Sequence, residues 1–350
     1  MLVVVIPTYN RSAKLERVID YYARESPKFN VVILDASDEL VHQEINKKTA
    51  ENNSDFVKII ETPEQKNLVE RLVTFLEKID DEIVAIGNDE DIFFPEFLDA
   101  AFAHLQENSD YVVAAGRYIT SARPIFGLRR ISYWTDSFLG MDVDNNDSAT
   151  RVINFQRLNT GGVPPLYWSV HRRSAFIEGS RLGLRLKFSG AVELMNQITS
   201  CVLGKIWISD QPMLLRDESR LNYVPEANRD EGELYIGIND LNEVVNIASE
   251  IWESDVVCAV KAVTSWYRPH KNGESYQSRI HGRSYCRFNV TSEAQNKRTL
   301  RYLHSAIKWS CTLGTLLSQF FAYLYFVRYM FIKGRGSTFI KVTKTIPVNK

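Results

Sequence analysis

The chain has 350 residues, of which 45% are hydrophobic and 24% are charged, and its formal net charge is -1. Such a chain can bury a substantial core, and its four cysteines form no Cys-x-x-Cys pair, which is typical of a reduced compartment. The first residues lead straight into an apolar strand without a basic leader, so we expect a cytoplasmic protein. The absence of a Walker loop, of Gly-x-Gly-x-x-Gly after the first strand and of His-Glu-x-x-His excludes the simplest phosphoryl-transfer, dinucleotide and zinc-protease classes.

The first part of the chain alternates between short apolar runs and helical patterns. Runs at 2–6, 31–34, 57–60 and 83–86 are typical of buried strands. Helical patterns follow the first three strands, the first with Ser12 placed to cap its start, the second from about residue 39 and the third over 65–78. This alternation predicts a parallel sheet that helices cover on both faces.

The middle of the chain continues with further strands and then becomes helical. Residues 111–116 and 206–208 are predicted strands, and 166–171 is an aromatic run whose alternation also predicts a strand. In such a strand Tyr167 and Trp168 are either core residues or a surface on which a sugar stacks. Residues 239–267 follow a mostly helical pattern. The acidic run 142–147 lacks the glycine and the final glutamate of an EF-hand loop and is interpreted as a surface loop.

Polar residues follow three of the predicted parallel strands. Thr8 and Tyr9 end the first, Asp35 ends the second, and the triplet Asp89-Glu90-Asp91 follows the fourth. Ligands of such sheets bind outside the carboxyl ends of the strands, so these residues are expected to share one crevice. Carboxylates at that edge are suitable ligands for a divalent cation that meets a diphosphate, although an acidic triplet is also typical of a solvated turn.

Three segments in order resemble family 2 glycosyltransferases of the GT-A fold: VVVIPTYNR at 3–11, LDAS at 34–37 and NDEDIFFP at 88–95. The resemblance implies an α/β fold, a GT-A (Rossmann-like) mostly parallel sheet flanked by helices, with a helical C-terminal extension. It implies a nucleotide-sugar-binding half at 1–110, an acceptor and catalytic half at 111–220 and a mainly helical region at 221–350. Many members have two acidic residues after the second strand, whereas Ala36 follows Asp35 here.

The same resemblance implies roles for individual residues. Asp35 would hold the nucleotide base, and Arg71, which lies in a segment similar to bacterial polysaccharide transferases, would contact the base or the diphosphate. A divalent cation, Mn²⁺ or Mg²⁺, would be bound by Asp91 with Asp89 near the ribose, and the register leaves Glu90 as an alternative ligand. The implied donor-binding set is Pro7, Thr8, Tyr9, Arg11, Asp35, Arg71, Asp89 and Glu90, and the implied metal ligands are Asp91 and Asp89.

Glu193 is the candidate catalytic base. Family members supply this base from a carboxylate at the start of a helix in the acceptor half, and the segment 190–195 is the best match in this chain. In the first turn of a helix, the positive end of the dipole would keep the carboxylate ionised. Glu193 could equally be a favourable first-turn acid without a catalytic role, since the usual second acid beside it is missing.

The C-terminal region is strongly basic. Ten lysines and arginines and no acidic residue follow Glu293, and the uncharged run 309–327 is rich in aromatic and aliphatic residues. A basic, aromatic segment of this kind is expected at the headgroup layer of a membrane, so 297–350 is either a peripheral contact with the inner face of the cytoplasmic membrane or a core or dimer helix. The charges do not form the aromatic-interleaved patch of a nucleic-acid site.

Together these features predict a metal-dependent glycosyltransferase, and the family resemblance implies that it inverts the anomeric configuration. It would move a sugar from a nucleotide-sugar donor to a hydroxyl of a glycan or a lipid-linked oligosaccharide, in polysaccharide, O-antigen or capsule biosynthesis. Two other classes remain open, a sugar-phosphate nucleotidyltransferase and a non-catalytic protein that binds sugar nucleotides. The first usually carries a glycine-rich loop after the first strand, where this chain has Thr8-Tyr9-Asn10-Arg11.

Overall fold

The first four strands of the computed structural model form a parallel sheet. They are β1 (Val3–Thr8), β2 (Asn30–Asp35), β3 (Val57–Glu61) and β4 (Ile83–Ile86), in the spatial order β3-β2-β1-β4. Each is rich in β-branched residues, and β1 and β4 are buried along their whole length, as central strands covered on both faces should be. The parallel arrangement predicted from the sequence is confirmed.

The structure describes residues 1–64, 67–125, 128–133, 143–159, 166–187, 189–218, 236–265, 267–269 and 275–278. The basic segment 297–350 lies outside the described residues. No described helix combines the length and the apolarity that crossing a bilayer requires.

The strands after residue 110 extend the same sheet rather than forming a separate one. Strand β8 (Val170–Arg172) pairs antiparallel with β4 and with β6 (Tyr111–Ile125), and β9 (Lys205–Glu218) runs parallel to β6. The short β5 (Ile92–Phe93) and the outlying β7 (Leu128–Tyr133) pair antiparallel with β9 and β6. Strands β1 to β4, β6 and β9 therefore run in one direction, and their carboxyl ends lie at the same edge.

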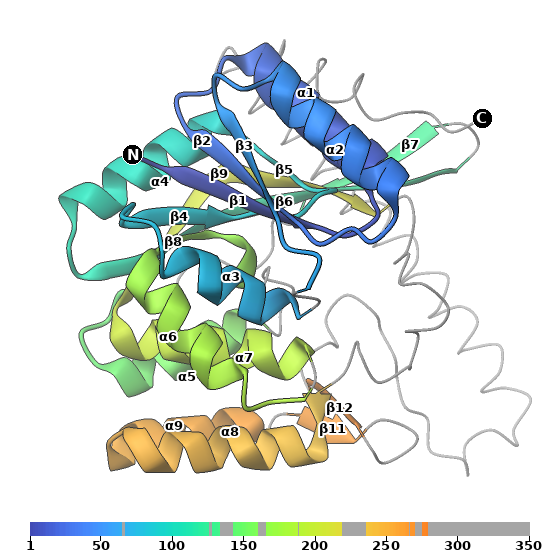
Figure 1. The fold of residues 1–350 in the computed structure, drawn as a ribbon. Helices are drawn as coiled ribbons and strands as arrows, with labels where there is room; N and C mark the ends of the chain where they lie inside the picture. Colours follow the sequence, from blue (N-terminus) through green and yellow to red (C-terminus); the bar gives the residue numbers. More distant parts are fainter. Residues whose placement is uncertain are drawn as a thin grey trace, which may run out of the picture.

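Helices cover both faces of the sheet (Figure 1). On one face lie α1 (Ser12–Glu25) and α2 (Leu40–Asn52), and the apolar stripe of α1, including Leu15, Val18 and Ile19, is fully buried as predicted. Ser12 does not cap this helix, because the cap position is Arg11 and the Ser12 hydroxyl contacts His42 Nδ1 at 2.7 Å instead. Helix α4 (Pro95–Glu107) follows β5 and packs against β6, β8 and β9.

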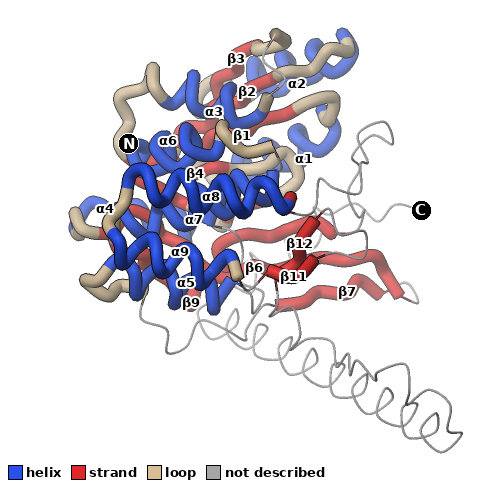
Figure 2. The backbone as a smooth tube through the Cα atoms, turned by 90° about the horizontal axis from the view of Figure 1, so that it is seen from below, coloured by secondary structure: helices blue, strands red, loops and turns tan. Residues whose placement is uncertain are grey.

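The opposite face carries two layers of helices. The first contains α3 (Leu68–Leu76), α6 (Arg173–Gly183), α7 (Ser189–Leu203) and α5 (Ser148–Asn159). The second contains α8 (Ile238–Ile251) and α9 (Ser254–Thr264), which pack against α5 and α7 and lie side by side when viewed from below (Figure 2). The helical pattern expected over 239–267 thus corresponds to two helices.

A small antiparallel sheet accompanies α8. It consists of β10 (Ile236–Gly237), β11 (Tyr267–Pro269) and β12 (Ser275–Ser278), in the order β10-β12-β11. The region from 221 onward is therefore helical between 238 and 264, with short strands at either side, within the residues that the structure describes.

The run 166–171 is not one strand, which corrects the expectation from its alternation. A 3-10 helix, η1 (Leu166–Trp168), precedes β8, and Tyr167 is only 2% exposed. His171 Nε2 donates to the Leu166 carbonyl at 2.8 Å, which closes the turn between the two elements. The alternation of apolar and polar residues could not distinguish this turn from a strand, because the Tyr167 ring is buried in either conformation.

Arginine side chains, one buried and two half-buried, satisfy carbonyl groups at the ends of elements. Arg173 donates to the Leu76 carbonyl at the end of α3, and Arg172 donates to the Tyr111 carbonyl at the start of β6. Arg151 donates to the Cys201 carbonyl near the end of α7. Such contacts replace water at carbonyls that a helix or strand leaves unpaired, and they connect β8 and α6 to both halves of the sheet.

His171 should make the stability of the fold pH-dependent. Its imidazole is fully buried, and burial lowers its pKa to about 4, so the folded protein keeps it neutral whereas the unfolded chain takes up a proton near pH 6.5. Its contribution is complete above pH 6.5 and is lost as the pH falls toward 4. Between pH 7.5 and 5, the wild type should lose about 2 kcal/mol more of its free energy of unfolding than His171→Gln. Urea denaturation at both pH values measures the difference, and an identical loss in the two proteins would contradict this role.

Candidate functional site

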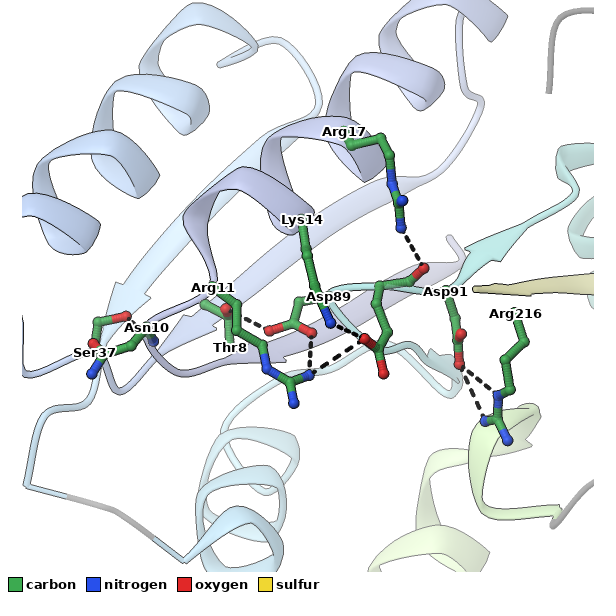
Figure 3. Close-up of polar contacts among 10 residues, drawn as sticks. Thr8, Asn10, Arg11, Lys14, Arg17, Ser37, Asp89, Asp91 and Arg216 are labelled. Atoms are coloured by element: carbon green, nitrogen blue, oxygen red, sulfur yellow. Dashed lines mark hydrogen bonds and ion pairs between the residues drawn. The ribbon is translucent and has the colours of Figure 1, made fainter. Parts of the chain in front are cut away.

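The acidic triplet directly follows β4, where the chain leaves the carboxyl edge of the sheet. Gly87 still donates its N–H to the Val5 carbonyl of β1, a turn closes with the Asp91 N–H on the Asn88 carbonyl, and β5 then begins at Ile92. This short path places three carboxylates beside the end of β1 and the start of α1 (Figure 3).

Asp89 is held by the residues that end β1. The Thr8 hydroxyl donates to Asp89 Oδ2 at 2.9 Å, and Arg11 Nη1 donates to Asp89 Oδ1 at 3.1 Å. Only 2% of Asp89 is exposed, so burial raises the pKa of its carboxyl, while Arg11 and Thr8 oppose that shift. Both oxygens of Asp89 therefore have a partner.

Glu90 is bound by the cationic face of α1. Its carboxylate forms an ion pair with Lys14 and lies 3.8 Å from Arg11 Nη1, and Arg17 donates to its main-chain carbonyl at 2.9 Å. Residues 11, 14 and 17 are three apart, so they lie on one side of the helix start. The beginning of α1 thus presents three cations to the acidic triplet (Figure 3).

Asp91 meets a cation from the other side. Arg216 on β9 donates from Nε and Nη2 to Asp91 Oδ2, at 3.3 and 3.2 Å. Asp91 is 2% exposed, and its second oxygen, Oδ1, is buried without a hydrogen-bond partner. Burial raises the pKa of Asp91 to about 6, and Arg216 opposes this shift. One half of this carboxylate is therefore satisfied, and the other half is not.

Asp35 and Arg71 lie next to this group. Asp35 accepts hydrogen bonds from the Ser37 N–H and from Asn46 Nδ2, both at 2.8 Å. Arg71 on α3 is 4% exposed, and neither its Nε nor its Nη1 has a hydrogen-bond partner. Burial lowers its pKa, whereas the nearby charges of Asp35 and Asp89 raise it. The site therefore contains a buried guanidinium with unused donors that feels the charges of two carboxylates.

The loops after β1 and β2 are fastened to each other. Pro7 and Thr8 pair with Leu34 and Asp35 in the β1–β2 register. The Tyr9 hydroxyl donates to Asp38 Oδ2 at 2.7 Å from a position that is 39% exposed. The next residue, Asn10, has a φ of 51° and donates its N–H to the Ser37 hydroxyl at 2.9 Å. These contacts fix the two loops at the rim of the site. The Ser37 hydroxyl is thereby engaged by the Asn10 N–H.

Glu193 is in the second turn of its helix, because α7 begins at Ser189, so the expectation of a first-turn position is wrong. The side chain is partly buried and accepts a hydrogen bond from Trp168 Nε1 at 3.3 Å. Burial raises the pKa of Glu193, while the Trp168 hydrogen bond and the charge of Arg216 lower it. Arg216 is therefore close enough to act on both Glu193 and Asp91.

The structure brings most of the predicted residues to one region and adds others. Hydrogen bonds, ion pairs or electrostatic effects on pKa connect one set of predicted residues, namely Thr8, Arg11, Asp35, Arg71 and the acidic triplet. Sequence reasoning missed several neighbours, of which Lys14 and Arg17 could have been found from their three-residue spacing after Arg11. The residues that sequence reasoning did not identify are Lys14, Arg17, Asn46 and Arg216. It also missed the contact of Asn10 with the loop after β2 and the hydrogen bond from Trp168 to Glu193.

Arg71 should lower the stability of the protein. A buried guanidinium with two unused donors costs free energy, and Asp35 and Asp89 both keep other hydrogen-bond donors when it is removed. Arg71→Met should therefore leave the free energy of unfolding unchanged or raise it by about 1 kcal/mol. Arg151→Met is the matched control, since Arg151 donates to four carbonyls, and it should destabilise by about 2 kcal/mol or more. Equal destabilisation of the two variants in urea denaturation would contradict the unsatisfied state of Arg71.

Solved structures of TarS from S. aureus are similar to this chain. One TarS structure has 15% sequence identity and a TM-score of 0.49, with 84% of this chain covered. The chain spans 46% of the length of that TarS chain. TarS 1-349 in complex with UDP matches with 15% identity, a TM-score of 0.47 and coverages of 84% and 76%. TarS 1-349 in complex with UDP-GlcNAc matches with 16% identity, a TM-score of 0.47 and coverages of 84% and 77%.

Among curated proteins none matches the chain. The family model described as glycosyl transferase family 2 matches residues 3–178, a segment that contains β1 to β6, the acidic triplet, Asp35 and Arg71. Because this model covers half of the chain, the chain belongs to glycosyl transferase family 2, and its mostly parallel sheet covered by helices agrees with the expected GT-A fold.

Proposed function

We propose that this glycosyltransferase moves a sugar from a nucleotide-sugar donor to a hydroxyl of a glycan or lipid-linked acceptor, with inversion and with help from a divalent cation. The observation that carries the proposal is a pair of incomplete groups at one edge of the sheet. Asp91 has a buried oxygen without a donor, and Arg71 has buried N–H groups without an acceptor. A divalent cation would bind the open oxygen of Asp91, and the diphosphate that carries this cation would accept hydrogen bonds from Arg71.

The donor nucleotide would lie along Asp35, Arg71 and Asp89. In the proposed arrangement Asp35, fixed by Ser37 and Asn46, accepts from the base, and Arg71 donates to a carbonyl of the base or to the diphosphate. Thr8 and Arg11 hold Asp89, which then faces the ribose. Pro7 would support the nucleotide from the end of β1, and Tyr9 would do so from the rim of the site.

The residues present fit a divalent cation at Asp91. Its open oxygen is a hard ligand, whereas both oxygens of Asp89 are engaged and Glu90 is paired with Lys14. Within the described part of the chain, no three His, Cys, Asp or Glu side chains form a group that could hold a metal by themselves. Diphosphate oxygens and water would complete the coordination shell. We therefore keep Asp91 as the direct ligand, and Mn²⁺ or Mg²⁺ would act as a Lewis acid on the leaving group.

Glu193 would accept the proton of the attacking acceptor hydroxyl. Its burial raises its pKa, which makes it a better proton acceptor than an exposed glutamate while Arg216 and Trp168 still favour the ionised form. In a direct displacement the hydroxyl oxygen bonds to the anomeric carbon, the bond to the diphosphate breaks, and the proton moves to a Glu193 oxygen. The diphosphate leaves with the bonding electrons, and the anomeric configuration inverts.

The acceptor and the pathway belong to the proposal alone. We propose a surface polysaccharide or a lipid-linked precursor, because the basic, aromatic segment 297–350 has the composition of a peripheral contact with anionic lipid. A nucleotidyltransferase or a non-catalytic sugar-nucleotide-binding protein would use the same sheet edge, so the two experiments below are chosen to separate these classes.

Nucleotide binding should depend on Asp91 and on a divalent cation. Calorimetric titration with a panel of nucleoside diphosphates should show binding of one of them that Mn²⁺ strengthens. Asp91→Asn removes the charge of the ligand and should weaken binding in Mn²⁺ by about tenfold or more, whereas the exposed Asp255→Asn should leave it unchanged. Binding that neither Mn²⁺ nor Asp91→Asn affects would contradict the metal site.

Glu193 should be needed for turnover and not for donor binding. Glu193→Gln keeps the shape and the Trp168 hydrogen bond, but it cannot accept a proton, so release of nucleoside diphosphate from the donor should slow by about 100-fold or more. Donor affinity should change by less than about threefold, and the exposed Glu178→Gln serves as the control. Tight binding without any turnover in the wild type would instead favour a sensor, and transfer of a nucleotidyl group to a sugar phosphate would favour the nucleotidyltransferase.

A further inference from the structure

Asp91 is contacted by Arg216, a cationic residue of β9. The antiparallel pairing of β9 with β5 matches Ile92 with Leu215 and Phe93 with Leu214. One more step in this register sets Asp91 opposite Arg216, so backbone pairing and not a flexible loop brings the two side chains together. Figure 3 shows Arg216 approaching Asp91 from the side opposite α1.

The contact uses only one side of the carboxylate. Arg216 Nε and Nη2 both donate to Oδ2, although a guanidinium can hold both oxygens of a carboxylate with two parallel hydrogen bonds. The contact distances, 3.3 and 3.2 Å, are long for hydrogen bonds between charged groups. The pair is therefore geometrically incomplete and weaker than a fork-to-fork pair.

The burial of the two partners differs. The Asp91 side chain is 2% exposed, whereas the Arg216 side chain is 29% exposed. The carboxylate is thus enclosed by the protein, and the guanidinium is the member of the pair that reaches solvent. Arg216 also acts electrostatically on Glu193, so its guanidinium is near enough to influence the proposed base while it contacts the proposed metal ligand.

We propose that Arg216 is a second cation for the donor, which Asp91 holds while the site is empty and which moves onto the diphosphate when a divalent cation takes its place at Asp91. This inference rests on the proposed function, since it assigns a residue to the diphosphate of that same site. Asp91 exchanges one positive partner for another, so its buried charge stays compensated in both states. The guanidinium then binds phosphate oxygens, for which its planar fork is suited, at the position where negative charge develops as the sugar leaves.

A role limited to orienting Asp91 predicts the opposite behaviour toward the metal. If Arg216 competes with the cation for Asp91, removing it should strengthen metal binding. If Arg216 only holds Asp91 in place, removing it should weaken metal binding. The sign of the change in Mn²⁺ affinity, measured without any nucleotide, therefore separates the two roles.

The test compares wild type, Arg216→Met and the control Arg181→Met, in which an exposed arginine paired with Glu77 is changed in the same way. Mn²⁺ binding alone is followed by electron paramagnetic resonance, and binding of inorganic pyrophosphate at saturating Mn²⁺ is followed by calorimetry. In Arg216→Met we expect Mn²⁺ affinity to rise about threefold or more and pyrophosphate affinity to fall about tenfold. The control should match the wild type in both titrations.

Each other outcome overturns the inference in a recognisable way. Weaker Mn²⁺ binding in Arg216→Met makes Arg216 a positioning residue for Asp91, and unchanged pyrophosphate binding removes it from the diphosphate site. In both cases the proposed function survives, because wild type still binds Mn²⁺ and pyrophosphate. Failure of the wild type to bind either probe overturns the metal-dependent donor site together with the inference. If Arg216→Met does not fold, Arg216→Lys replaces it, since it keeps the charge without the fork and should still weaken pyrophosphate binding.

Discussion

The burial of carboxylates at the carboxyl edge of the sheet is the constraint on which the site depends. Asp35, Asp89 and Asp91 are each 2% exposed, and a buried carboxylate without compensation costs several kcal/mol. Compensation comes from the chain itself, through the Thr8 hydroxyl and Arg11 at Asp89, through Asn46 at Asp35, and through Arg216 at Asp91. Strand register and charge therefore depend on each other, because a shift of β1 against β4 or of β5 against β9 would leave a buried charge alone.

The two aspartates of the triplet differ in a way that burial alone does not explain. Both are buried to the same degree, yet Asp89 has a partner on each oxygen and Asp91 on only one. Arg71 is the complementary case, a buried cation whose Nε and Nη1 are unused. Structural ion pairs are normally satisfied within the fold, so one open acceptor on Asp91 and two open donor atoms on Arg71, residues that both interact electrostatically with Asp89, favour a ligand that carries both signs of charge. This is the physical basis for the proposed cation and diphosphate.

The sequence was sufficient for the features that depend on short-range patterns. The β-branched runs that became β1 to β4, and the polar residues that end them, are local signals, and they located Asp35 and the triplet correctly. Three local signals gave a result that differs from the structure. Ser12 contacts His42 instead of capping α1, Tyr167 is buried in a 3-10 turn, and α7 begins four residues before Glu193. Arg216 could not have been found, since it reaches Asp91 across 125 residues through a pairing with a two-residue strand.

The proposed base and the acidic triplet are positioned by the same strand pairing. Trp168, which donates to Glu193, immediately precedes Ser169, whose carbonyl accepts the Ile86 N–H at the end of β4. Three residues after Ile86 the chain reaches Asp89, the first residue of the triplet, and Ala85 pairs with Val170 in the adjoining register. The partner of Glu193 is thus fixed to the strand that leads into Asp89 and Asp91, while Arg216 reaches the same group from β9. Backbone hydrogen bonds between the strands, together with the turn after β4, therefore set the separation between the residue proposed to take the proton and the residues proposed to hold the leaving group.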